Sequence, residues 1–201
     1  MKALLKLSAA VDWLSIQVGK YVIWLIGIST TISAVNACVR KLFNVGSNAF
    51  LEVQWYLFAT SFLLAAGYTL LNNEHVRIDV VSGRFSKRGQ IWIDIIGFVL
   101  FLLPVCFAVL WFSIPWFLQA LRSGETSANA GGLILWPVYA MLPVGFSLLL
   151  LQAFSELIKR FAFLKGLIDD PTTKKGEKSA EEELAEEIRR LAEANAQSAK
   201  A

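Results

Sequence analysis

The stretch IIGFVLFLLPVCFAVLWFSIPWFLQAL, residues 95–121, contains no Asp, Glu, Lys, Arg or His. A helix needs roughly 20 apolar residues to cross the hydrocarbon core of a bilayer, which is about 30 Å thick. Three further runs have the same character, at residues 21–39, 53–71 and 133–155. Inside lipid the backbone N–H and C=O groups must find partners within the protein, so such runs form helices. The sequence therefore predicts an all-α integral membrane protein with four transmembrane helices.

The composition of the whole chain agrees with this fold class. Of its 201 residues, 56% are hydrophobic, and the mean hydropathy is +0.54. A soluble domain has about 45–50% apolar residues, spread with the period of a half-buried helix or strand. We expect a membrane domain at residues 21–165, with spans at about 21–39, 50–71, 91–121 and 133–158.

Residues 1–20 are expected to form an amphipathic helix that precedes the first span. Asp12 interrupts the early apolar residues, which argues against a cleaved signal peptide. Trp13 suits the lipid headgroup layer, so we expect this helix to lie in the membrane interface. Its apolar side chains follow helical spacing: Leu4, Leu7, Val11 and Leu14.

The chain becomes polar and rich in Glu, Ala, Lys and Arg over residues 166–201. A capping box of Ser179 and Glu182 predicts a cytoplasmic helix at about 179–197. Its apolar stripe is narrow, formed by Leu184, Ile188 and Leu191. This tail helix is either solvated and marginally stable, or a surface for a partner or for self-association.

The basic residues predict the orientation in the membrane. They gather before the first span, after the second and after the fourth: Lys2, Lys6, Lys20, Arg77, Arg84, Lys87, Arg88, Lys159, Arg160 and Lys165. The other side has fewer: Arg40, Lys41 and Arg122. The positive-inside rule therefore places both termini in the cytoplasm. The longest outward segment, RSGETSANAGG at 122–132, is small and polar; it is not expected to hold a fold of its own but offers a docking surface.

Motifs of membrane enzymes do not occur in this sequence. His75 is the sole histidine, whereas a haem bound between helices needs paired histidine ligands. The sequence has no H-E-x-x-H, no phosphate-binding G-x-x-x-x-G-K-[ST] and no G-x-S-x-G. Cys38 and Cys106 are far apart and form no C-x-x-C pair. We expect no catalytic site, no metal, no cofactor and no nucleic-acid partner.

The four uncharged runs also argue against an ion-coupled carrier, which usually places ionisable residues at mid-membrane. Asn36, Gln54 and Gln119 are polar, but they lie near span ends or can bond across helices. Prolines in the last two spans predict kinks or local distortions: Pro104, Pro115, Pro137 and Pro143. Together these features favour a membrane scaffold. The alternative is an autonomous four-helix channel or small carrier that works as a homo-oligomer.

The second span leaves the membrane through NNEHVRIDVV at residues 72–81. In an extended segment His75, Arg77 and Asp79 share one side, opposite the apolar residues between them. No nucleophile accompanies them, so the residues alone indicate an ordered exit from the bilayer.

The longer stretch LEVQWYLFATSFLLAAGYTLLNNEHVRIDVV, residues 51–81, resembles the signature region of the small membrane subunit (Q-type, DctQ-like) of tripartite ATP-independent periplasmic (TRAP) transporters. The matching positions are Glu52, Tyr56, Leu57, Phe58, Glu74, His75, Val76, Arg77, Ile78 and Asp79. The segment WPVYAMLPVGFSLLLLQ, residues 136–152, is similar to a second recurrent region of the family. The resemblance covers roughly residues 10–165 and leaves out the charged tail.

This resemblance implies a role in the uptake of organic acids, driven by an ion gradient and not by ATP. The implied partners are a large membrane subunit, with which the chain forms a heterodimer, and a periplasmic substrate-binding protein. The small subunit is implied to be a scaffold in the bacterial inner membrane, crossing it several times.

The resemblance also marks candidate contact residues. Glu52 enters the second span from the outer side, and Tyr56 follows one turn later. Glu74, His75, Arg77 and Asp79 lie at the cytoplasmic interface. Arg77 and Asp79 are expected to fix the exit geometry or to contact the large subunit; lipid contact and local capping are the alternative. His75 is given no proton-transfer role.

Overall fold

The computed structural model describes residues 1–44, 46–74, 85–129, 131–168 and 171. Its helices are α1 (Lys2–Phe43), α2 (Asn48–Leu71), α4 (Lys87–Gly97), the π-helical turn η1 (Phe98–Leu102), α5 (Leu103–Ser123) and α6 (Trp136–Leu164). His75, Arg77, Asp79 and the predicted tail helix lie outside the described residues.

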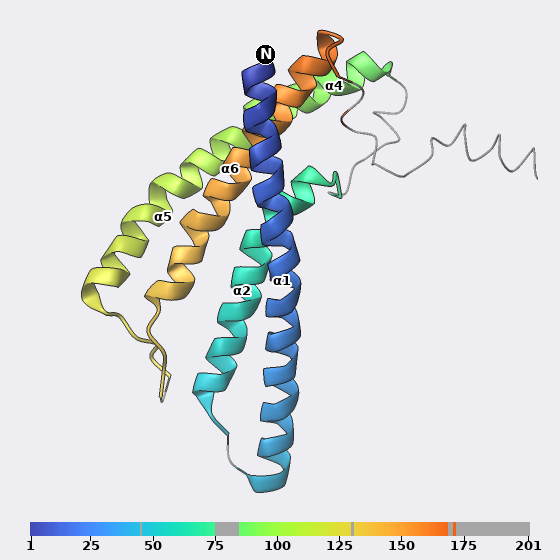
Figure 1. Ribbon diagram of the computed structural model, residues 1–201. Coiled ribbons are helices and arrows are strands. Elements are labelled where there is room, and N and C mark those ends of the chain that lie inside the picture. Colours follow the sequence, from blue (N-terminus) through green and yellow to red (C-terminus); the bar gives the residue numbers. More distant parts are fainter. Residues whose placement is uncertain (45, 75–84, 130, 169–170, 172–201) are drawn as a thin grey trace, which may run out of the picture.

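Four stretches in the described residues are long and apolar enough to cross a membrane: Lys2–Phe43, Asn48–Leu71, Lys87–Ser123 and Trp136–Leu164. The all-α prediction with four spanning helices is therefore confirmed. In Figure 1 the N-terminus, α4 and the end of α6 lie at one end of the bundle, which we call the N-terminal end. The connections α1–α2 and α5–α6 lie at the other, which we call the loop end.

Helix α1 carries both the expected lead-in and the first span without a break. Its buried residues include Ser8, Ser15, Gly19 and Val22, which recur at helical spacing. Gly19 allows the close approach of α2, because a Cβ atom there would lie 2.5 Å from Cγ of Tyr68. The placement of residues 1–20 in the membrane interface stays a prediction.

The third span is distorted where the sequence places Pro104. The turn η1 ends one residue before α5, and Pro104 occupies the first turn of α5. Proline has no N–H to donate to the carbonyl four residues earlier, and a π-turn is one way in which a helix absorbs such a defect. The other prolines do not interrupt their helices. Pro115 lies inside α5 and Pro143 inside α6, and Pro137 occupies the first turn of α6, where a proline is well tolerated.

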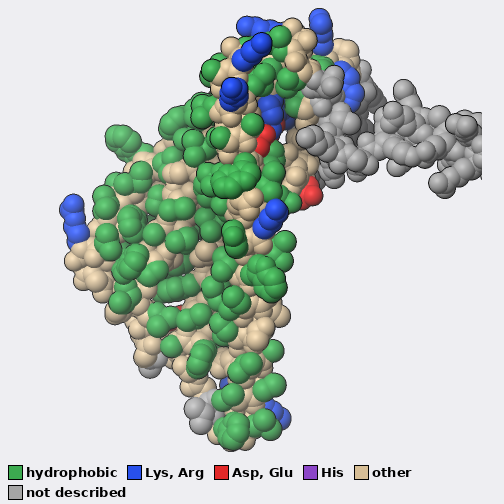
Figure 2. Space-filling model, viewed as in Figure 1, with side chains coloured by type: hydrophobic (Ala, Val, Ile, Leu, Met, Phe, Trp, Pro, Cys, Tyr) green, Lys and Arg blue, Asp and Glu red, His purple; other side chains and the backbone are tan. Residues whose placement is uncertain are grey.

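Helix α6 is the centre of the bundle, because it packs against α1, α2, α4 and α5. Helices α2 and α6 meet through glycine, since a Cβ atom on Gly145 would lie 2.8 Å from the carbonyl oxygen of Leu63. Such close approach of backbones is typical of membrane helix pairs. Figure 2 shows hydrophobic side chains over most of the visible face, with Lys and Arg gathered towards the N-terminal end, as expected for a surface in contact with lipid.

Candidate functional site

Glu52 is the buried acidic residue of the loop end. It lies in the second turn of α2, and only 3% of its surface is exposed. One carboxylate oxygen accepts a hydrogen bond from the backbone N–H of Leu133 at 2.7 Å. The other accepts one from the side-chain amide of Asn129 at 2.7 Å and one from the hydroxyl of Ser127. A buried carboxylate is stable when donors surround it in this way.

All three donors belong to the α5–α6 connection, so Glu52 organises a segment far away in the sequence. The ends of this connection pair with each other. Thr126 and Ile134 form an isolated antiparallel bridge, and the N–H of Ser127 donates to the carbonyl of Leu133 at 2.9 Å. The small polar residues of the segment were not expected to hold a fold of their own. The structure shows that α2 supplies the missing contacts.

Tyr56 strengthens the same attachment. It lies one helical turn after Glu52, and its hydroxyl donates to the carbonyl oxygen of Ile134 at 3.2 Å. We call the group of Glu52, Tyr56, Ser127, Asn129, Leu133 and Ile134 the Glu52 site. The structure thus brings two of the predicted residues together on one loop.

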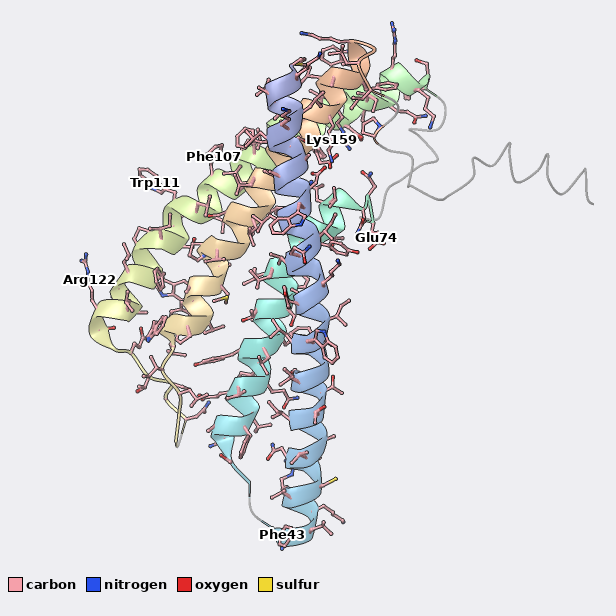
Figure 3. All side chains as sticks on the ribbon, in the orientation of Figure 1. Phe43, Glu74, Phe107, Trp111, Arg122 and Lys159 are labelled. Carbon is pink, nitrogen blue, oxygen red and sulfur yellow. The ribbon has the colours of Figure 1, made fainter. Side chains whose placement is uncertain are left out.

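Glu74, the third predicted residue within the described ranges, lies elsewhere. Its side chain is exposed beyond the end of α2, and its backbone N–H donates to the carbonyl of Thr69 at 3.2 Å. In Figure 3 it projects from the end of α2 that is remote from the Glu52 site.

A second polar group, at the N-terminal end, was not anticipated from the sequence. The side chain of Arg160 on α6 is fully buried. Its Nε and Nη2 atoms donate to Oδ2 of Asp94 on α4, at 3.1 and 3.0 Å. Its Nη1 atom pairs with Glu156 at 2.5 Å, and the guanidinium carbon lies 4.5 Å from the ring centre of Phe98. The guanidinium group therefore joins α4, η1 and α6.

Glu156 extends this group towards α1. Only 1% of its surface is exposed, and it forms a second ion pair with Lys159. Lys159 in turn reaches Asp12 of α1, with its Nζ atom 3.1 Å from Oδ2. Gln152 completes the connection by donating from its amide to Asp12 at 2.9 Å and to Glu156 at 3.2 Å.

Hydroxyl groups line the same face of α1. Ser8 and Ser155 share a hydrogen bond of 2.6 Å, and Ser15 donates to the amide oxygen of Gln152 at 2.7 Å. Ser155 also donates to Asp12 at 2.8 Å. We call this group the Arg160 network; its members are Ser8, Asp12, Ser15, Asp94, Gln152, Ser155, Glu156, Lys159 and Arg160.

A signal for the network is present in the sequence. Ser8, Asp12 and Ser15 fall on one side of a helix, and so do Gln152, Ser155, Glu156 and Lys159. Ser8, Asp12 and Ser15 fall within the predicted lead-in at residues 1–20, and Gln152 and Ser155 fall within the fourth uncharged run. Lys159 and Arg160 were used only as orientation signals. Only the packing of α1 against α6 shows that these two sets of side chains face each other.

Both the Glu52 site and the Arg160 network join separate elements of the fold through hydrogen bonds and ion pairs. Within the described ranges, no group of three or more His, Cys, Asp or Glu side chains is placed to hold a metal ion. The buried charged side chains of these ranges are Glu52, Glu156 and Arg160, and each is matched by donors or by an opposite charge.

A family model, DctQ component of the tripartite ATP-independent periplasmic transporters, matches residues 29–163, which is more than half of the chain. The chain belongs to this family. Neither a curated protein nor a solved structure gives a match.

The resemblance drawn from residues 51–81 is thereby confirmed. A DctQ component is a membrane subunit of a transport system and not an enzyme. The matched residues include the whole Glu52 site and most of α6, whereas Asp12 on α1 lies before them. The contacts that join residues 2–28 of α1 to α6 therefore lie outside the residues that the family model matches.

Proposed function

We propose that this DctQ component is the fixed scaffold of a TRAP transporter that takes up organic acids. In this proposal it forms a heterodimer with the large, ion-coupled membrane subunit in the bacterial inner membrane. Both termini lie in the cytoplasm, as the distribution of Lys and Arg favours. The loop end then faces the periplasm.

The matching of buried charges carries the scaffold role. A subunit that moves ions or carboxylates through the membrane keeps ionisable groups available along the path. Here Glu52, Glu156 and Arg160 are occupied by partners within the chain. They also lie near the two ends of the bundle, and the uncharged runs fill the space between them. This arrangement supports a rigid body and not a permeation pathway.

The Glu52 site supports a docking role for the α5–α6 connection. In the proposed orientation this connection faces the periplasm, where the substrate-binding protein is found. A loop held by Glu52 and Tyr56 presents a constant shape, so little conformational entropy is lost when a partner binds. We therefore propose that it contributes to the surface on which the substrate-binding protein docks.

The exit segment after α2 belongs to the proposal as well. We propose that Arg77 and Asp79 contact the large subunit, as the resemblance implies. Arg77→Ala or Asp79→Ala should then lower uptake by weakening assembly, with the substrate affinity of the binding protein unchanged. Normal recovery of the complex from both variants would remove these residues from the interface.

The test of the proposed function is purification of the tagged chain from its native membrane in mild detergent, followed by mass spectrometry. Recovery of a large multi-span protein at about one copy per copy of this chain is expected. Reconstituted vesicles that hold both subunits should accumulate an organic acid only with an ion gradient and the binding protein. Recovery of this chain alone, with transport by it alone, would establish the homo-oligomeric channel or carrier instead.

A further inference from the structure

We propose that the groove between α1 and α2 at the loop end binds an anionic phospholipid, with one acyl chain along the groove and the phosphate at Arg40. In the proposed orientation this lipid belongs to the outer leaflet of the inner membrane. The inference goes beyond the proposed function, because it concerns a lipid ligand of this chain and not its assembly with other subunits.

The walls of the groove suit a hydrocarbon chain. The groove has a volume of about 260 Å³, and its apolar lining is formed by Ile32, Val35 and Val39 of α1 and Phe50 of α2. Val35 is 56% exposed and Phe50 is 55% exposed, so both offer apolar surface to a ligand. Thr31 also lines the groove, but its hydroxyl donates to the carbonyl of Gly27 in its own helix, at 2.8 Å.

The position of the groove along α1 matches one leaflet of a bilayer. Lys20 and Arg40 are the cations on either side of the uncharged run 21–39. They are separated by about 30 Å at 1.5 Å per residue, which equals the thickness of the hydrocarbon core. Arg40 therefore lies at the level of the headgroups. The groove residues 31–39 cover about 12 Å below it, out of roughly 15 Å for one leaflet.

Arg40 lies at the mouth of this groove. Ile32 and Asn36 line the groove, and Arg40 follows Asn36 by four residues, so the three side chains form one row along α1. A Cβ atom on Gly46 would lie 3.9 Å from Cδ of Arg40, which shows that the arginine side chain extends over the α1–α2 connection. Ser47, the next residue of that connection, also lines the groove. A ligand in the groove would therefore meet Arg40 where its chain reaches the membrane surface.

The charge at the mouth is that of an anion site. Arg40 and Lys41 are exposed cations on the side of the membrane that the positive-inside rule leaves poor in cations. Neither forms an ion pair within the part of the chain that the structure describes. Glu52 at the same end is already occupied by its three donors. A guanidinium group binds phosphate through two parallel hydrogen bonds, so a phosphate headgroup matches Arg40.

The two halves of the site together select the ligand. An apolar groove of acyl-chain depth and a cation at headgroup level are satisfied at once by a phospholipid. Phosphatidylglycerol should bind better than phosphatidylcholine, because the choline headgroup brings a positive charge towards Arg40 and Lys41. A partner helix in the groove would satisfy the apolar walls but would leave Arg40 without an anion, unless it carried an acidic residue at that level.

The test is a titration of the full chain, purified in detergent and freed of lipid, with phosphatidylglycerol. Native mass spectrometry counts the lipids that remain bound. We expect one tightly bound phosphatidylglycerol per chain, and about tenfold weaker binding for Arg40→Gln, the effect of losing a hydrogen bond to a charged group. Lys41→Gln is the matched control: it removes the same charge, but its side chain points about 100° away from the row that lines the groove. Its affinity should change less than twofold.

A second pair of variants tests the groove itself. Val35→Trp fills the groove and should weaken the binding of phosphatidylglycerol at least tenfold. Val105→Trp is the control, because Val105 on α5 is 53% exposed and does not line this groove. Both positions are on the surface, so both variants should keep the apparent Tm of the unchanged chain.

Three outcomes would overturn the proposal. Equal weakening by Arg40→Gln and Lys41→Gln would show attraction to the general charge of this end, and unchanged binding in Val35→Trp would show that the acyl chain lies elsewhere. Loss of the bound lipid when a large subunit is recovered with the chain would show that a protein segment occupies the groove. The proposed function is tested separately, by the recovery of the large subunit, and stands or falls without the lipid.

Discussion

The carboxylate of Glu52, in the second turn of α2, accepts a hydrogen bond from the backbone N–H of Leu133 at 2.7 Å. These residues are 81 positions apart, and the bond fixes the α5–α6 connection to a helix with which α5 has no extensive contact. The loop is therefore attached to α2, and one carboxylate accepts three of the hydrogen bonds that attach it.

Glu52→Gln should loosen this loop. The glutamine side chain keeps the shape but replaces one acceptor oxygen by a donor, so the donors of Leu133, Asn129 and Ser127 cannot all be satisfied. Hydrogen exchange of the Leu133 amide, measured by mass spectrometry, should become at least severalfold faster. Glu74→Gln, at an exposed side chain, should leave the exchange unchanged. Slow exchange in Glu52→Gln would show that the loop holds its shape without the carboxylate.

Tyr56→Phe should have a smaller effect in the same experiment. It removes one hydrogen bond, to the carbonyl of Ile134, and keeps the ring. A bond of this kind contributes about 1 kcal/mol. Faster exchange confined to the residues near Ile134 is expected. An effect as large as that of Glu52→Gln would contradict the prediction that Tyr56 contributes less than Glu52.

Arg160→Met should strongly destabilise the N-terminal end. Asp94 would lose its ion pair and the fully buried Glu156 one of its two, and breaking a buried pair on one side costs roughly 3–5 kcal/mol. The apparent Tm in detergent should fall well below that of Lys165→Met, a control at an exposed cation on the same side of the bundle. Adding Glu156→Gln to Arg160→Met should restore part of the loss. An equal Tm for Arg160→Met and the control would refute the structural role of the network.

Asp12 offers a way to separate charge from hydrogen bonding. Asp12→Asn keeps an acceptor for Ser155 and Gln152 but removes the ion pair with Lys159. In that pair the side chain of Asp12 is 23% exposed and that of Lys159 is 16% exposed. Such a pair contributes about 1 kcal/mol or less. Asp12→Leu removes both kinds of contact and should lower the Tm further. If both variants match the unchanged protein, α1 is held by its apolar contacts alone.

Gly145→Ala should destabilise the contact between α2 and α6. The added methyl group would lie 2.8 Å from the carbonyl oxygen of Leu63, which belongs to the backbone and cannot turn aside. Overpacking of this kind costs about 1–3 kcal/mol. Gly97→Ala is the control, since a Cβ atom there has no neighbour within 4 Å and alanine favours a helix. Equal stability of the two variants would mean that the helices can separate without loss.

Several features of the molecule follow from the sequence because they are local. The uncharged runs predicted the spanning helices, and the defect beside Pro104 was predicted by the missing N–H. Glu52 and Tyr56 were selected by their resemblance to a family signature, which gave their importance but not their bonds. The spacing of one helical turn places them on the same side, and the loop that they hold lies too far along the chain to be paired with them.

The Arg160 network shows what a single sequence leaves hidden. Asp12, Lys159 and Asp94 are charged residues of the kind expected at the end of a span, where charged side chains reach water. Which of these side chains form ion pairs depends on how α1 and α4 pack against α6. This packing is determined by contacts along the whole bundle. The contacts of Ser8 and Ser15 with α6 likewise require that α1 continues unbroken through residue 20.

The ion pair between Asp12 and Lys159 joins positions 147 apart, and this separation sets an order of events during biosynthesis. Chains are synthesised at about 5–20 residues per second, so Asp12 exists for roughly 7–30 s before Lys159 is made. During that time the first helix has no charged partner on the last one, and its carboxylate must remain in water or among headgroups. The polar contact that joins the first helix to the last one is therefore completed only near the end of synthesis, after the α1–α2 contact has become possible.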